Sequence, residues 1–223
     1  DLRVVATSVV TRLDEVIVVG SGGLAGALSP LLAGSQESIR VTADGYSARL
    51  SDNPRVDTRR PVLGIVGSLS EVARRQTNEL VGRTRVASLI LDFRRVDRLK
   101  SRIVTYLAKG RDVVLVTASP TTRVDVEDSP RIAALVADVV RTAFGSVHNL
   151  GVFLTGGDTA RSAIRALGGT AVMVRREITP GIVLSTFLAS AGGHTGVVPL
   201  VTKAGGFGAD DAMIRAYACL GKT

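Results

Sequence analysis

Four turns rich in Gly, Ser or Thr, each placed directly after a short apolar run, hold the residues of this chain that are best suited to chemistry. The turns lie at residues 20–23, 67–70, 155–159 and 203–208. Glycine lets backbone N–H groups approach an anion closely, and the start of a following helix adds the positive end of its dipole. The pattern therefore predicts loops that hold phosphate groups or sugar hydroxyls.

The first turn, Gly-Ser-Gly-Gly at residues 20–23, fits a dinucleotide-binding fingerprint. An apolar run at 16–19 predicts a strand before it, residues 23–33 predict a helix after it, and Asp44 lies about 20 residues further on, where a ribose-binding acid belongs. Small residues here would also let the helix pack closely on a sheet without any ligand. A dinucleotide-dependent oxidoreductase is therefore one hypothesis, beside a purely structural role for this turn.

The second and third turns could bind a ligand or could simply cap a helix. Ser68 and Ser70 precede a helix predicted at 71–81, where the hydroxyl of either serine can accept from an orphan N–H or contact an anion. In the third turn, Gly156 and Gly157 permit a positive φ, while Asp158 and Thr159 can cap the next helix or hold a ligand hydroxyl. Because Asp158 would repel phosphate, we expect it to contact sugar hydroxyls or the hydration shell of a Mg²⁺ ion.

The fourth turn concentrates glycines at positions 205, 206 and 208, directly after a strand predicted at 200–202. This concentration costs conformational entropy that a simple turn does not need. We therefore interpret Gly205 and Gly206 as part of a ligand loop whose backbone N–H groups form an anion nest. Lys203 either supplies a point charge for phosphate or is a solvated side chain at the end of the strand.

Short β-branched runs alternate with longer amphipathic stretches, which predicts an α/β fold of three layers, α/β/α, with a mainly parallel sheet. Ligands bind such folds beyond the carboxyl ends of the strands. The polar segment 34–61 is predicted to be a connection or a short hairpin. The strands are predicted at 16–19, 62–66, 88–91, 113–117, 151–155, 170–174 and 200–202, and the helices at 23–33, 71–81, 97–109, 130–144, 159–166 and 209–220.

Composition narrows the class of protein. The apolar runs of this 223-residue chain are far shorter than the roughly 20 residues that span a bilayer, and no P-loop motif occurs. The net charge is +8, but the arginines occur singly or in pairs and aromatic residues make up only 4%, which argues against nucleic-acid binding. One cysteine, Cys219, and two isolated histidines, His148 and His194, predict neither a disulfide nor a metal centre, and the cytoplasm is the expected compartment.

Four segments in a fixed order resemble a known family. They are PVLGIVGSLS at 61–70 with RRQ at 74–76, TGGDTA at 155–160, EITPG at 177–181 and KAGGFG at 203–208. Together they look like the nucleotide-binding domain of the four-carbon acid sugar kinases, from about residue 61 to the C-terminus. Residues 16–32 also look like the piece that precedes this domain in the family.

This resemblance implies transfer of phosphate from ATP, with Mg²⁺, to the terminal hydroxyl of an acid sugar such as threonate, erythronate or 3-oxo-tetronate. Asp158 stands where the family often has Glu. A nucleotide-sensing module without catalytic activity is the alternative that the residues leave open. By the likeness, Ser68 contacts the nucleotide, Gly156, Gly157, Asp158 and Thr159 line its phosphate or ribose side, and Gly205 and Gly206 close the pocket.

The resemblance also predicts two parts in the chain. Residues 1–60 are expected to be a connecting segment at the end of a preceding sugar-binding domain, and 61–223 the nucleotide-binding domain. The sugar-binding domain of the family is not found in these residues, so the chain looks like the C-terminal portion of a kinase. Substrate selection and the catalytic base are expected in the missing part, and this portion alone is expected to transfer little phosphate. A homodimer is one option for the assembly.

Overall fold

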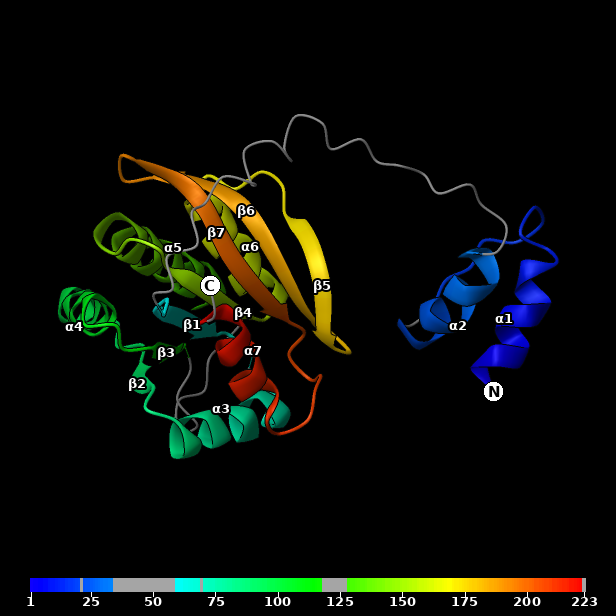
Figure 1. Ribbon diagram of the computed structural model, residues 1–223, viewed down its shortest axis with the longest axis horizontal. Helices are drawn as coiled ribbons and strands as arrows, with labels where there is room; N and C mark the ends of the chain where they lie inside the picture. The colour runs from blue at the N-terminus through cyan, green and yellow to red at the C-terminus, as the bar shows by residue number, and fades with distance from the viewer. Residues whose placement is uncertain (21, 34–58, 69, 118–127, 222–223) are drawn as a thin grey trace. The chain divides into compact units, whose positions relative to one another are not determined.

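The computed structural model describes residues 1–20, 22–33, 59–68, 70–117 and 128–221 (Figure 1). The chain divides into two compact units, Asp1–Asn53 and Pro54–Thr223. None of the described helices is long and apolar enough to cross a membrane. Most of the predicted connection at 34–61, including Asp44, lies outside the described residues.

The first unit contains two helices, α1 (Leu2–Val10) and α2 (Gly22–Ala33). The strand predicted at 16–19 is wrong, because these residues form no strand and the side chains of Ile17 and Val19 are almost fully exposed. The described part of this unit offers no neighbouring strand with which they could pair their backbone groups. A dinucleotide fingerprint requires a strand before the turn, so the oxidoreductase hypothesis loses its structural basis.

The second unit contains a seven-stranded sheet with the strand order β2-β3-β1-β4-β7-β6-β5 (Figure 1). The first five strands in this order are parallel to one another, and β6 and β5 complete the sheet in antiparallel order. The predicted α/β class with a mainly parallel sheet is confirmed. The strands are β1 (Val62–Val66), β2 (Ala87–Ile90), β3 (Val113–Val116), β4 (Gly151–Thr155), β5 (Met173–Thr179), β6 (Ile182–Ala191) and β7 (His194–Lys203).

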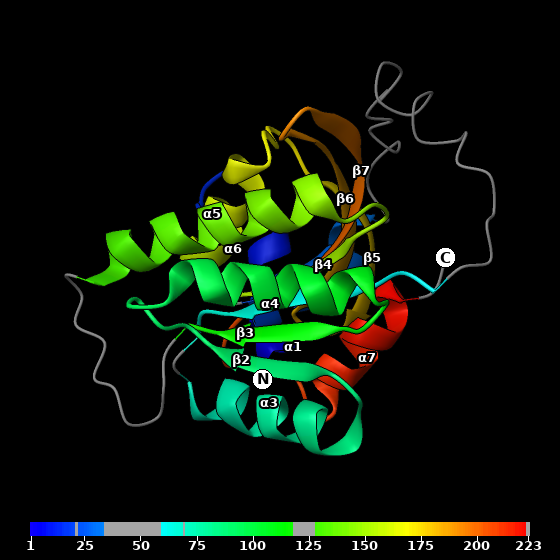
Figure 2. The same ribbon diagram turned by 90° about the vertical axis from the view of Figure 1, so that its left-hand side faces the viewer.

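Helices cover both faces of this sheet, each over its own apolar core, which gives the three predicted layers. On one face Ile65 and Leu154 pack with residues of α4, α5 and α6, and on the other Val62 and Phe153 pack with residues of α3 and α7. Figure 2 shows α4 and α5 on one side of β2 and β3 and α3 on the other. The helices are α3 (Glu71–Arg83), α4 (Val96–Ala108), α5 (Ser129–Ser146), α6 (Gly157–Ala166) and α7 (Ala212–Leu220).

The predicted elements differ from the structure mainly around β5, β6 and β7. The strand predicted at 170–174 begins only at Met173, the strand predicted at 200–202 begins at His194, and β6 is not predicted at all. The β6 and β7 strands form a long antiparallel hairpin in which small and polar residues alternate with buried ones, so no continuous apolar run marks them. The other predicted elements of this unit are confirmed, with their ends shifted by a few residues.

Strand β1 approaches α7 so closely at Gly64 that no side chain fits there. A Cβ at Gly64 would overlap the hydroxyl of Tyr217 and lie 2.8 Å from its Cζ. Tyr217 is buried, and its hydroxyl donates to the carbonyl of Val113 at 2.9 Å. Burial raises the pKa of this hydroxyl well above its usual value, so it remains a protonated donor.

We expect Gly64→Ala to lower the free energy of unfolding by about 1–3 kcal/mol, because the new methyl group overpacks the core. Tyr217→Phe in the same background should restore part of the loss, since it removes the nearest atom. Gly82→Ala in α3 is the matched control, because its Cβ would meet nothing within 4 Å. Urea unfolding checks this, and equal destabilisation by both glycine substitutions would contradict the packing argument.

Candidate functional site

Three of the four predicted turns meet at the carboxyl ends of neighbouring strands of the sheet. Strands β1, β4 and β7 are parallel neighbours, so their carboxyl ends lie side by side. The turns at 67–70, 155–159 and 203–208 follow these ends directly. The turn at 20–23 belongs to the first unit and follows no strand. The edge formed by β1, β4 and β7 is where ligands bind in folds of this kind.

The turn after β1 touches the turn after β4 through backbone atoms. The N–H of Gly67 donates to the carbonyl of Thr155 at 3.0 Å, and a Cβ at Gly67 would overlap the hydroxyl of Thr159. Gly156 has a φ of +97°, and its Cβ would lie 3.5 Å from the nitrogen of Ser68. Gly67 leaves no room for a side chain, and Gly156 has a backbone conformation that favours glycine. The two turns therefore form one narrow junction.

The turn after β7 joins the same junction. The Ser70 hydroxyl donates to the carbonyl of Gly205 at 3.0 Å and accepts from the N–H of Ala73, so it caps α3 and links two turns. Ser68 donates to the Ser70 hydroxyl at 3.1 Å, and a Cβ at Gly205 would overlap the Ser68 hydroxyl. A Cβ at Gly206 would meet nothing within 4 Å, so this glycine borders open space.

Helix α6 begins at the junction without a side-chain cap from any residue that the structure describes. Its N-cap residue, Gly156, has no side chain, which leaves the N–H groups of the first turn open to a ligand. Asp158 is exposed and forms no ion pair within the described part of the chain, whereas Thr159 is buried. The hydroxyl of Thr155, directly before this helix, is buried and also lacks a hydrogen-bond partner among the described residues.

Lys203 is the cation of this junction. It is only 3% exposed, and its ammonium group donates to the carbonyls of Ala204 at 2.9 Å and Gly205 at 2.7 Å. It has no carboxylate partner in the described ranges, and burial lowers its pKa to about 8. The interpretation of Lys203 as a solvated side chain is therefore wrong, because the lysine is buried and holds the glycine-rich turn in place.

A buried glutamine of α3, to which the sequence patterns assign no role, supports the same turn. The Nε2 of Gln76 lies 2.9–3.0 Å from the carbonyl oxygens of Phe207, Gly208 and Ala209, to which it donates. Its Oε1 is buried without a partner in the described part of the chain. The signal in the sequence is a glutamine at a core position, since it shares the buried face of α3 with Ala73.

The turn between β5 and β6 braces the glycine-rich turn from another side. Glu177 accepts a hydrogen bond from the N–H of Gly181 at 2.9 Å, and Gly181 has a φ of +78°. A Cβ at Gly181 would lie 2.7 Å from the ring of Phe207, which is itself half exposed. The segment at 177–181 therefore lies against the segment at 203–208, and an aromatic ring faces solvent beside the junction.

Taken together, the junction can bind an oxyanion. It combines open N–H groups at a helix start, a buried lysine and glycine positions that a Cβ would fill. Of the predicted site residues, Ser68, Gly156, Thr159 and Gly205 contact one another directly, while Gly157, Asp158 and Gly206 border open space or solvent.

Comparisons with known proteins agree with this chemistry. Residues 63–213 match a family model described as a nucleotide-binding C-terminal domain. The chain is 35% identical to a D-threonate kinase of Cupriavidus necator over 89% of its own length and 46% of that protein. It is 27% identical to a D-threonate kinase of Salmonella typhimurium over 97% of its own length and 51% of that protein. The chain thus spans about half the length of the curated relatives it matches.

Solved structures have the same fold. A crystal structure from Bordetella bronchiseptica, described as a domain of unknown function in a domain-swapped dimer with bound citrate, is 26% identical and has a TM-score of 0.54 over 99% of this chain and 51% of that one. A protein of Haemophilus influenzae, at 18% identity and a TM-score of 0.62 over 98% of this chain and 51% of that one, shares the fold. With the sequence matches, these findings show that the chain belongs to the family of nucleotide-binding C-terminal domains of the four-carbon acid sugar kinases.

Proposed function

We propose that this chain is the ATP site of a kinase that phosphorylates the terminal hydroxyl of a four-carbon acid sugar such as D-threonate. The observation that carries the proposal is the junction of three turns at the carboxyl ends of β1, β4 and β7. Phosphoryl transfer depends mainly on positioning and on neutralising charge, which backbone N–H groups and a buried cation can supply. The curated relatives are D-threonate kinases, which favours this substrate class.

In this proposal each residue of the junction has its own part in binding the nucleotide. The open N–H groups of Gly157 and its neighbours at the start of α6 hold phosphate oxygens, and Gly156 provides the positive φ that begins this turn. The turn with Gly205 and Gly206 closes over the phosphates, and Ser68 and Thr159 fix the distance between the turns. Lys203 adds positive charge beneath them. Bound Mg²⁺·ATP supplies the phosphoryl group that is transferred.

The proposed Mg²⁺ ion fits a site with few protein ligands. Within the described ranges no group of three or more His, Cys, Asp or Glu side chains lies close enough to hold a metal ion. Magnesium in kinases is held by substrate phosphates, water and one or two carboxylates. The exposed carboxylate of Asp158, at the start of α6, is the candidate, either directly or through a water molecule.

Residues 1–60 are proposed to be the end of a preceding domain that binds the acid sugar. Among the side chains of α1 and α2 whose burial the structure describes, only Ala6 and Leu28 are buried, while Leu2, Val4 and Leu31 are exposed, so these described residues form no sizeable core. The curated relatives are about twice as long as this chain, which leaves room for such a domain. A homodimer is proposed by analogy with the domain-swapped relative.

We expect Gly157→Asp to weaken the binding of ADP·Mg²⁺ at least tenfold, because a carboxylate in the first turn of α6 repels phosphate. A Cβ at Gly157 would meet nothing within 4 Å, so the substitution leaves the fold intact. Gly157→Ala is the matched control and should bind within about threefold of the unchanged chain, since it adds only a methyl group. Calorimetric titration measures both, and unchanged affinity in Gly157→Asp would refute the assigned phosphate site.

The buried Lys203 predicts a pH dependence of nucleotide binding. Below its pKa of about 8 the ammonium group is charged and attracts phosphate, whereas above it binding requires uptake of a proton. The affinity for ADP should therefore fall several-fold, and by at most about tenfold per pH unit, as the pH rises above 8. The phosphates of ADP are already ionised there.

Lys203→Met is the variant that tests this assignment. It should bind ADP more weakly at every pH, because the turn loses two hydrogen bonds, and the decrease above pH 8 should disappear. Titrations between pH 7 and 9.5 measure both effects. A profile that keeps its slope in Lys203→Met would assign the titration to another group.

The proposal that two domains act together predicts that kinase activity requires both of them. This chain together with a sugar-binding domain of the family should form ADP from ATP in the presence of D-threonate, whereas this chain alone should bind ADP and show no turnover above background. A coupled assay of ADP formation measures this. Nucleotide binding without turnover when both domains are present, over a series of four-carbon acids, would instead support a sensing module.

A further inference from the structure

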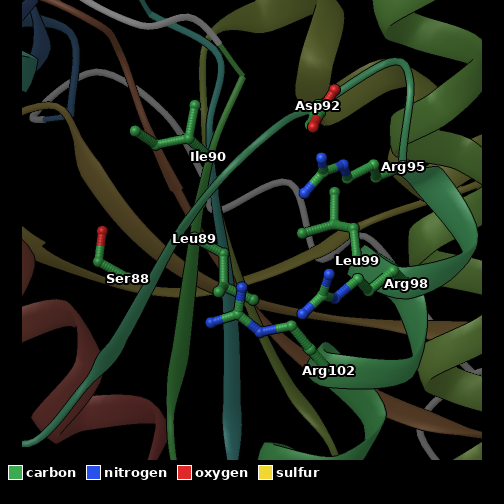
Figure 3. A pocket seen from close by; sticks show the side chains of 8 residues that line it. All are labelled: Ser88, Leu89, Ile90, Asp92, Arg95, Arg98, Leu99 and Arg102. Atoms are coloured by element: carbon green, nitrogen blue, oxygen red, sulfur yellow. The ribbon is translucent and has the colours of Figure 1, made fainter.

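A cavity lined by arginines lies beside the edge strand β2, which three strands separate from β7. Its volume is about 480 Å³, within the range of pockets that hold small ligands. One wall is the edge strand β2, and the other is α4. Figure 3 shows Arg95, Arg98 and Arg102 extending from the helix side toward the strand. The lining residues are Ser88, Leu89, Ile90, Asp92, Arg95, Arg98, Leu99 and Arg102.

None of these three arginines forms an ion pair with a carboxylate in the part of the chain that the structure describes. The acidic groups nearby have other partners. Asp92, the one acid in the lining, accepts a hydrogen bond from the N–H of Arg94 at 2.9 Å. Asp97 and Asp138 both pair with Lys100, at 3.1 and 2.8 Å. The described lining of the cavity therefore carries more positive than negative charge.

The spacing of the arginines indicates the shape of the anion. Arg98 and Arg102 lie one turn apart on one face of α4, and Arg95 is the N-cap residue directly before this helix. The three arginines therefore line the cavity over about two turns, or about 10 Å of helix axis. The guanidinium of Arg102 lowers the pKa of the Tyr106 hydroxyl through a hydrogen bond and its charge. Tyr106 therefore lies next to the row of arginines. A row of this length exceeds what one phosphate group contacts and matches a linear anion with several charged groups.

We propose that this cavity is a binding site for a linear oligophosphate, separate from the nucleotide junction. Arginine guanidinium groups bind phosphate oxygens in a bidentate manner, which a row of three arginines can repeat along a chain of phosphates. Two strands, β3 and β1, separate β2 from β4, and the cavity shares no lining residue with the three turns. Bound there, the anion lies against α4 and the edge of the sheet.

The test is calorimetric titration of the 223-residue chain with tripolyphosphate, in the presence of saturating ADP to block the nucleotide junction. Arg98→Gln/Arg102→Gln should weaken tripolyphosphate binding at least tenfold, because two charge-assisted contacts are lost. Both side chains are exposed, so the fold is retained. Arg141→Gln, which removes an exposed charge from α5, is the control and should leave the affinity within about twofold.

Four further results test the proposal. Inorganic phosphate should bind at least tenfold more weakly than tripolyphosphate, and ADP affinity should be unchanged in the double variant. If Arg141→Gln weakened binding as much, per charge removed, as the double variant does, only net charge would matter and the proposal would be overturned. Loss of tripolyphosphate binding in Gly157→Asp but not in the arginine variant would also overturn it, by assigning the anion to the nucleotide junction.

Discussion

The structure depends on a backbone contact at which no side chain fits. Gly67, after β1, lies against Thr159 at the start of α6, and its N–H bonds to the carbonyl of Thr155. This contact fixes how far apart the ends of β1 and β4 lie, and the turn after β7 attaches to the same place through Ser70 and Gly205. The open start of α6 and the buried Lys203 lie at the same junction.

Burying Lys203 without a carboxylate is costly, and the fold offsets the cost with two carbonyl groups. A cation neutralised by an acid would offer little to an incoming phosphate, whereas one that contacts only carbonyl dipoles keeps its charge for the ligand. The pKa of Lys203 is lowered because the two carbonyl groups do not fully replace the water that burial removes from the ammonium group. The arginines of α4 are the opposite case, because they stay in water and retain their charge at little cost.

Much of this fold could be predicted from sequence because the parallel strands are buried on both faces and read as apolar runs, as β1 and β4 do. The apolar run at 16–19 fails because a strand also needs a neighbour, which periodicity does not report. The hairpin of β6 and β7 is missed for the opposite reason. Each strand pairs with the other along its length, so both form although polar residues interrupt their apolar pattern. In the site, glycine turns could be located from sequence, but Gln76 could not be assigned, because its role depends on a loop 131 residues away.

The hydrogen bonds of Gln76 have a thermodynamic consequence. Helix α3 carries Ser70 at its start and Gln76 one and a half turns later, so a single rigid element holds two parts of the turn after β7. A glycine-rich loop would normally lose much conformational freedom when it closes on a ligand. Here the ordering has already taken place during folding, and its cost belongs to the stability of the domain. The site is preorganised, and its glycines serve close approach rather than mobility.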